Sequence, residues 1–259
     1  MTTAPAAPSV PARSPMDLER RTAFLGGAFY VLTFLSSIPA TLLLSPVLDD
    51  PQYVLGTGRD TQVVFAAGLE IVNALACIGT AVVLYPVVKR QSQALALGFV
   101  TSRVLEAAIL FTGIVSVLAV VTLRQDVAGT PGADADSLLT VAAGLVAVRE
   151  WSLLLGPGMA IANALLLGTL MYRSRLVPRV IPVMGLVGAP LLLVANVLTM
   201  FGYNEQFSLL SLIALPGIFF WELSLGVYLM VKGFRPAPIL TSAMAAPAAR
   251  RADAVVVTR

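Results

Sequence analysis

Long apolar segments separated by short polar breaks dominate this chain. Six of them come near the ~20 residues that a helix needs to cross ~30 Å of hydrocarbon, and the breaks contain charged residues or turn formers. The predicted spans cover residues 23–44, 63–85, 95–121, 151–172, 180–201 and 207–231. The pattern therefore predicts an all-α fold, a polytopic integral membrane protein built as a bundle of six transmembrane helices.

The two ends of the chain lack this pattern. We expect disordered tails at 1–20 and 234–259, because these segments are rich in Pro and Ala and show no hydrophobic period. One transmembrane domain is then expected over 21–233. Arg20-Arg21 weakly matches a twin-arginine export signal, but the apolar run after it is too long for a signal core and lacks a convincing cleavage site. That run is therefore interpreted as the first span.

One apolar segment, 137–148, is shorter than the others. A run of this length fits an interfacial or re-entrant piece, or an extension of the fourth helix beyond the membrane. If it crossed the membrane, the chain would have seven spans, with Arg149 and Glu150 at an end of the added helix. Six is the number that we expect.

The basic residues between the spans are distributed unevenly. With six spans, the segments on one side carry Arg13, Arg20, Arg21, Lys89, Arg90, Arg173, Arg175, Arg179, Lys232, Arg235, Arg250, Arg251 and Arg259. On the other side the only basic residues are Arg59, Arg124 and Arg149, among a larger number of acids. Since cytoplasmic loops are enriched in Lys and Arg, we expect a bacterial cell-membrane protein with both termini in the cytoplasm.

Composition supports the membrane class and removes several kinds of site. The 259 residues are 58% hydrophobic and 12% charged, whereas soluble domains are about a quarter charged. Histidine is absent and Cys77 is the only cysteine, which excludes His-ligated metal or haem, a Ser-His-Asp triad and disulfides. The sequence also lacks a phosphate-binding loop and a basic-aromatic nucleic-acid surface. We therefore expect no cofactor, no metal and no nucleic-acid partner.

Four charged residues fall inside the predicted spans, where a charge is costly and by default indicates a functional site. Glu70 is expected about 10 Å below the outer end of the second span. Arg103 and Glu106 lie near the middle of the third span, and Glu222 lies in the inner half of the sixth. Asn73 shares the face of Glu70, one turn away. Because consecutive antiparallel helices are usually neighbours, we expect Glu70, Arg103 and Glu106 to meet.

This group has two interpretations. In the structural one, Arg103 pairs with one carboxylate and holds the second and third helices together. In the functional one, a solvated cavity or proton path is lined by Glu70, Asn73, Arg103, Glu106 and Glu222. Two acids beside one arginine leave an unpaired acid, which must be protonated or exposed to water. The sequence leaves both interpretations open.

Other polar residues are assigned to packing or to interfaces. Asn163 and Asn196 are expected to form hydrogen bonds between helices, and Cys77 is expected to pack as a small buried residue. We expect Arg149-Glu150-Trp151 at the outer interface, where its charges reach water. Gly156-Pro157-Gly158 is expected to kink the fourth helix.

Several passages together resemble a bacterial membrane-protein family known as domain of unknown function 4386. They are Arg21-Thr22-Ala23 with Gly27 and Tyr30, Arg173-Ser174-Arg175-Leu176-Val177-Pro178-Arg179, Gly185-Leu186-Val187-Gly188, and the last helix with Trp221-Glu222. The arginine-rich 173–179 loop is the most specific of them. The resemblance covers about residues 20–234 and implies a multi-span membrane protein, and it brings no reaction, ligand or catalytic residue.

Three functions follow from these observations. The first is a small transporter or channel-like protein, because of the charges inside the spans. The second is a non-transporting sensor, scaffold or assembly partner, because no internal repeat, selectivity filter or catalytic constellation is found. The third is an intramembrane enzyme. The expected partners are the lipid bilayer, a small-molecule or ion ligand, and a membrane partner protein.

Overall fold

The computed structural model describes residues 15–56, 58–127, 134–205 and 208–240, and these residues form an all-helical bundle without a strand. The helices are α1 (Pro15–Leu43), α2 (Ser45–Leu48), α3 (Asp60–Val88), α4 (Gln93–Val127), α5 (Ala135–Ser174), α6 (Val180–Met200) and α7 (Leu209–Val231). Within the described ranges, every helix except the one-turn α2 is long and apolar enough to cross a membrane. The six-helix, all-α prediction is thus confirmed.

Helix α5 decides between the interpretations of the short apolar segment 137–148. It runs without interruption through 137–148 and on to Ser174, so this segment extends the fourth membrane helix, and the seven-span alternative is wrong. With 40 residues, α5 is about 60 Å long, roughly twice the hydrocarbon thickness of a bilayer. Pro157 lies inside the helix and does not end it.

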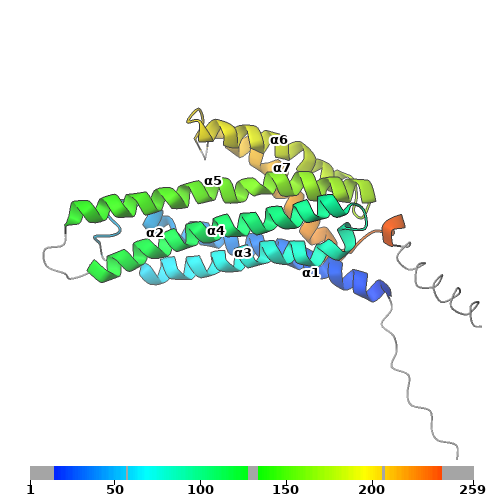
Figure 1. Ribbon diagram of the computed structural model, residues 1–259, viewed down its shortest axis with the longest axis horizontal. Coiled ribbons are helices and arrows are strands. Elements are labelled where there is room, and N and C mark those ends of the chain that lie inside the picture. Colours follow the sequence, from blue (N-terminus) through cyan, green and yellow to red (C-terminus); the bar gives the residue numbers. More distant parts are fainter. Residues whose placement is uncertain (1–14, 57, 128–133, 206–207, 241–259) are drawn as a thin grey trace, which may run out of the picture.

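The six long helices form a closed ring in chain order. Each packs against the next, and α7 packs against α1. The helices alternate in direction, so the bundle has two ends. We call the end with the α3–α4 and α5–α6 connections the terminal end, because the described chain begins and finishes there (Figure 1). The opposite end, with the α1–α3, α4–α5 and α6–α7 connections, is the distal end.

Glycines bring the helix backbones close together toward the terminal end. A Cβ on Gly27 of α1 would lie 2.5 Å from the carbonyl oxygen of Gly226 on α7, and one on Gly185 of α6 would lie 2.6 Å from Trp221. Small residues allow such contact where no hydrophobic driving force draws helices together in lipid. The main core cluster fills this half of the molecule and includes the fully buried Tyr30, Phe99 and Trp221. This half is therefore tightly sealed.

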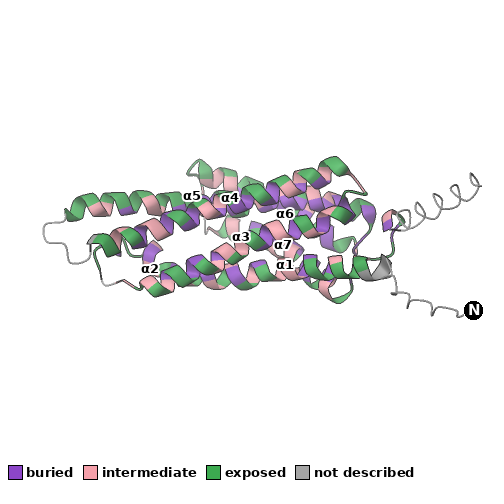
Figure 2. Ribbon diagram, turned by 60° about the horizontal axis from the view of Figure 1, so that its bottom comes forward, coloured by how far each residue is buried: buried purple, intermediate pink, exposed green. Residues whose placement is uncertain are grey.

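The outward faces of the helices are exposed (Figure 2), and many of the side chains on them are apolar. Examples are Phe65 on α3, Val115 on α4 and Leu193 on α6, each with roughly half or more of its surface accessible. A soluble protein hides most such side chains, whereas a membrane protein presents them to lipid. This distribution agrees with a multi-pass membrane protein.

Parts of both expected tails pack on the bundle. Helix α1 begins at Pro15, and Arg20 donates hydrogen bonds to the carbonyl oxygens of Leu229, Met230 and Val231 at the end of α7. An arginine at this position complements the helix dipole. Past the end of α7, the Arg235 amide donates to the Leu176 carbonyl at 2.8 Å. Parts of 15–20 and 234–240 thus contact the bundle, and 1–14 and 241–259 lie outside the described residues.

A polar lock joins the distal ends of α3 and α4. Arg124 forms an ion pair with Asp60 and donates a 2.7 Å hydrogen bond to the Gly56 carbonyl. The Tyr53 hydroxyl donates to the same Asp60 carboxylate at 2.7 Å. Burial and this hydrogen bond raise the pKa of Tyr53 above its usual value. The lock fixes the α1–α3 connection beside the extended part of α4.

Candidate functional site: a polar cavity inside the bundle

A cavity of about 380 Å³ opens between the helices in the distal half of the bundle, and all six long helices line it. Its polar lining residues include Ser37, Glu70, Asn73, Arg103, Glu106, Asn196, Ser211 and Glu222. The five residues proposed from sequence, Glu70, Asn73, Arg103, Glu106 and Glu222, thus face one common space. Phe34, Leu110, Ile218, Phe219 and other apolar side chains form most of the remaining wall.

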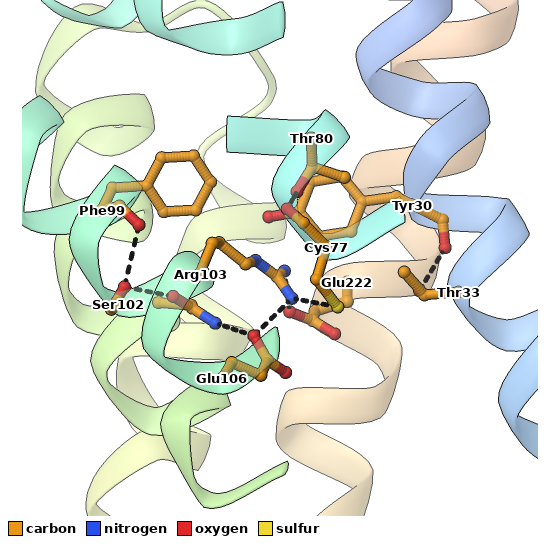
Figure 3. Close-up of polar contacts among 10 residues, drawn as sticks. Tyr30, Thr33, Cys77, Thr80, Phe99, Ser102, Arg103, Glu106 and Glu222 are labelled. Carbon is orange, nitrogen blue, oxygen red and sulfur yellow. Dashed lines mark hydrogen bonds and ion pairs between the residues drawn. The ribbon is translucent and has the colours of Figure 1, made fainter. Parts of the chain in front are cut away.

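Arg103 lies at the inner end of this cavity and joins two helices through ion pairs (Figure 3). Its Nη1 lies 3.0 Å from Oε2 of Glu106, one turn along α4, and its Nη2 lies 2.5 Å from Oε1 of Glu222 on α7. Only 1% of the Arg103 side chain is exposed. The ion pairs of Arg103 therefore connect α4 to α7, and not to α3 as the structural interpretation of the sequence expects.

Glu106 is held from a third helix. The side-chain amide of Asn163 on α5 donates to Glu106 Oε2 at 2.7 Å, and its carbonyl oxygen accepts a hydrogen bond from Ser102 of α4. Asn163 is 1% exposed. The prediction that Asn163 is an interhelical hydrogen-bond partner is confirmed, while Asn196 lines the cavity wall.

Aromatic rings close the cavity behind Arg103. The guanidinium carbon lies 4.9 Å from the centre of the Tyr30 ring on α1 and 6.0 Å from that of Phe99 on α4. The Tyr30 hydroxyl is buried without a hydrogen-bond partner among the described residues. Cys77 is also buried here, with its sulfur 3.7 Å from Arg103 Nη1. Cation–π contacts of this kind favour the charged guanidinium in a dry environment.

Glu70 does not pair with Arg103, which corrects the expected grouping. It forms a buried ion pair with Arg149 of α5. Arg149 is 0% exposed, so its expected place in water at the outer interface is also wrong, although its neighbours Glu150 and Trp151 are exposed. In a bundle with a 40-residue α5, Arg149 lies well inside the helix and not at its end.

Gly113 of α4 makes this pairing possible. A Cβ at Gly113 would lie 2.8 Å from the Cβ of Ser152 and 2.9 Å from Nη1 of Arg149. Real Cβ atoms avoid such distances, so the missing side chain leaves the space through which Arg149 passes α4 toward α3. In the sequence, nothing distinguishes Gly113 from the other glycines of this Gly-rich chain.

The buried charges do not balance. Glu70, Glu106 and Glu222 supply three carboxylates, and Arg103 and Arg149 supply two guanidinium groups. The excess negative charge must be removed by a proton, a bound cation or water, because an unpaired carboxylate is costly at low dielectric. In chemical terms, the site can hold one proton or one monovalent cation. No group of three or more potential metal ligands occurs in the described parts of the chain.

Comparison with known proteins gives one match. The sequence model of the family described as Domain of unknown function (DUF4386) matches residues 25–233, which leave out the first ten residues of α1 and include all the other long helices. No curated protein matches the chain, and no solved structure does.

Proposed function

The chain belongs to the family described as Domain of unknown function (DUF4386), and we propose that this member is a small transporter or channel-like protein. Its solute path includes the cavity that ends at Arg103. One observation carries the proposal: a membrane-length bundle contains a cavity whose lining has more carboxylates than arginines.

The open space favours transport over a purely structural role for these charges. A structural ion pair in a membrane bundle is satisfied by packing side chains around it. Here Glu70, Arg103 and Glu222 face a cavity of about 380 Å³ instead. Ionisable residues within membrane spans that line such cavities mark ion and substrate paths.

The two halves of the bundle suggest how transport proceeds. The cavity extends toward the distal end, where Thr41 of α1 and Ser211 of α7 line it. On the other side of Arg103, the fully buried Tyr30 and Phe99 pack against its guanidinium group and separate the cavity from the terminal end. In this conformation a solute reaches Arg103 from the distal side alone. Passage to the other side requires this aromatic layer to open, which is an alternating-access step.

The proposal includes a direction relative to the membrane. Basic residues gather at the terminal end, among them Arg20, Arg90, Arg175 and Arg235. By the positive-inside rule this end faces the cytoplasm, and both termini lie there. The cavity then opens toward the outside of a bacterial cell.

Proton flux into reconstituted vesicles tests the proposal. The purified full chain is reconstituted with an entrapped pH-sensitive dye, and a potassium diffusion potential drives proton entry. Vesicles with the wild-type chain should acidify faster than empty vesicles, and Arg103→Ala, Glu106→Gln or Glu222→Gln should slow this about tenfold or more. The matched control is Glu150→Gln, which removes an exposed carboxylate next to the buried Arg149.

Two results would contradict the proposal. Wild-type vesicles that acidify no faster than empty ones would favour a non-transporting membrane component. Flux that is the same in Glu106→Gln, Glu222→Gln and wild type would remove the cavity from the path. Since Arg103→Ala leaves two buried carboxylates unpaired, the two glutamine variants decide the outcome if the alanine variant fails to fold.

A further inference from the structure

The cavity lining carries a charge that selects its ligand. Three carboxylates, those of Glu70, Glu106 and Glu222, face the cavity, while Arg103 is the lining residue with positive charge. Arg149 neutralises Glu70 from the far side and is not part of the lining. Even with Arg149 counted, one negative charge remains in excess, so a cation gains and an anion is repelled at low dielectric.

Glu70 offers this cation a buried, unpaired acceptor. Its Oε1 accepts from Arg149, but its Oε2 has no hydrogen-bond partner among the described residues. The residue is only 5% exposed and lines the cavity together with Asn73, one turn further along α3. A buried carboxylate oxygen without a partner is rare in native structures. It marks the position where a positive group of the ligand would lie.

The wall formed by α1 and α7 includes an apolar, aromatic part. Phe34 of α1 and Phe219 of α7 meet edge to face with ring centres 5.0 Å apart, and both line the cavity with Leu215 and Ile218. A bare metal ion needs oxygen ligands on several sides, which this wall does not provide. An organic cation fits both the charged and the apolar regions of the cavity wall. Its charge lies near the carboxylates and the aromatic faces, and its apolar groups lie against the leucines.

The seam between α1 and α7 gives such a molecule access from the bilayer. In the sealed half, Gly27 and Gly226 bring these helices into backbone contact. In the distal half, Ile38 of α1 and Leu212 of α7 both line the cavity and are 50% and 56% exposed. Figure 1 shows α6 and α7 leaning away from the other long helices toward this end. The mouth of the cavity is therefore bordered by lipid-facing side chains.

From these observations we infer that the cavity binds an amphiphilic, monovalent organic cation that enters from the distal leaflet between α1 and α7. This inference deepens the proposed function and rests on it for the transport step, while binding can be measured independently. Glu70 Oε2 and the Glu106–Glu222 pair hold the charge, and Phe34 and Phe219 contact the apolar part.

Binding of two ions of the same shape and opposite charge tests the inference. Equilibrium dialysis measures tetraphenylphosphonium and tetraphenylborate against the purified full chain in detergent, with empty micelles subtracted. Saturable binding of the phosphonium ion is expected, without saturable binding of the borate ion. Glu70→Gln should weaken phosphonium binding about tenfold or more, because it neutralises the unpaired acceptor. Glu150→Gln should leave it unchanged.

A second variant avoids the folding risk of altering a buried ion pair. Phe219→Leu keeps an apolar side chain of similar volume and every charge, and removes one aromatic face. It should weaken phosphonium binding several-fold, with no change in the elution volume of the protein on size exclusion. Binding that is unaffected by both Phe219→Leu and Glu70→Gln would overturn the inference, as would equal saturable binding of the two ions.

Binding and transport can fail separately. Saturable, Glu70-dependent binding of the phosphonium ion without proton flux supports the inference about the ligand and contradicts the transport proposal. Proton flux that depends on Glu106 and Glu222, without saturable phosphonium binding, supports transport and overturns the inference.

Discussion

Arg149 forms a buried ion pair with Glu70 although α4 lies between the helices that carry them. The two residues are 79 positions apart in the sequence. The long arginine side chain passes the surface of α4 at Gly113 and reaches the wall of the cavity from behind. The pair therefore fixes the relative rotation of α3, α4 and α5, and it leaves Oε2 of Glu70 buried without a hydrogen-bond partner among the described residues.

Gly113→Ala should disrupt this arrangement. The added methyl group would lie 2.8 Å from Ser152 Cβ and 2.9 Å from Arg149 Nη1, so Arg149 or the helix must shift. We expect a loss of about 1–3 kcal/mol in the free energy of unfolding, measured by denaturant titration in detergent. Gly144→Ala is the matched control, since nothing lies within 4 Å of the added atom and alanine favours the helix. Equal stability of the two variants would contradict the close passage of Arg149.

A double-mutant cycle measures the Glu70–Arg149 pair itself. Glu70→Gln or Arg149→Met alone leaves one buried charge without its partner, which destabilises proteins by about 3–5 kcal/mol. The double variant should lose less than the sum of the two single losses, and the difference, the coupling energy, should be about 1–3 kcal/mol. Additive losses would mean that the two charges do not interact in the membrane.

Substitution of Arg103 and substitution of its partner Glu222 should change the stability of the protein by different amounts. Arg103→Ala leaves Glu106 and Glu222 unpaired and should destabilise the protein by about 3–5 kcal/mol. Glu222→Gln removes the excess charge while Arg103 keeps Glu106, so the free energy of unfolding should change by about 1 kcal/mol or less. Denaturant titration of both variants measures this contrast. A large loss of free energy of unfolding in Glu222→Gln would show that the main role of Glu222 is to stabilise the fold as a partner of Arg103.

Gly27→Ala tests the seal at the terminal end. An added Cβ would lie 2.5 Å from the Gly226 carbonyl oxygen and 2.7 Å from the Met230 amide nitrogen, both of which are backbone atoms. The seam between α1 and α7 must then widen, with a loss of about 1–3 kcal/mol in the free energy of unfolding. Gly68→Ala on α3, with open space around it, is the control. Unchanged stability in Gly27→Ala would mean that the helices do not pack this closely.

The helices could be predicted from the sequence because membrane spans are fixed by length and apolar content, which are local properties. The shared cavity of Glu70, Arg103, Glu106 and Glu222 was also predictable, because charges within a span avoid lipid. The pairing of these residues was not, because it depends on how each helix is rotated. Assigning Arg149 to the outer interface assumed that the fourth span began at Trp151, whereas α5 begins at Ala135.

Tyr30 and Gly113 are further residues of the site that sequence patterns do not identify. Tyr30 covers the Arg103 guanidinium from α1, and an aromatic residue in an apolar helix carries no sign of such a contact. Gly113 acts through a missing side chain, and its importance appears only when α5 is placed beside α4. Both depend on contacts between helices that are distant in the chain.

Accessibility of residue 37 tests the central claim most directly, since a solute path requires a cavity that solutes can enter. Ser37→Cys and Leu35→Cys are made in a Cys77→Ala background; Ser37 lines the cavity, whereas Leu35 on the same helix is 66% exposed on the outer surface. Reconstituted proteins are treated with cationic and anionic methanethiosulfonate reagents of similar size. The cationic reagent should modify Cys at position 37 about tenfold faster than the anionic one and should block proton flux, while position 35 stays unmodified by both. Equal protection of positions 35 and 37 would contradict a solute-accessible cavity at Arg103.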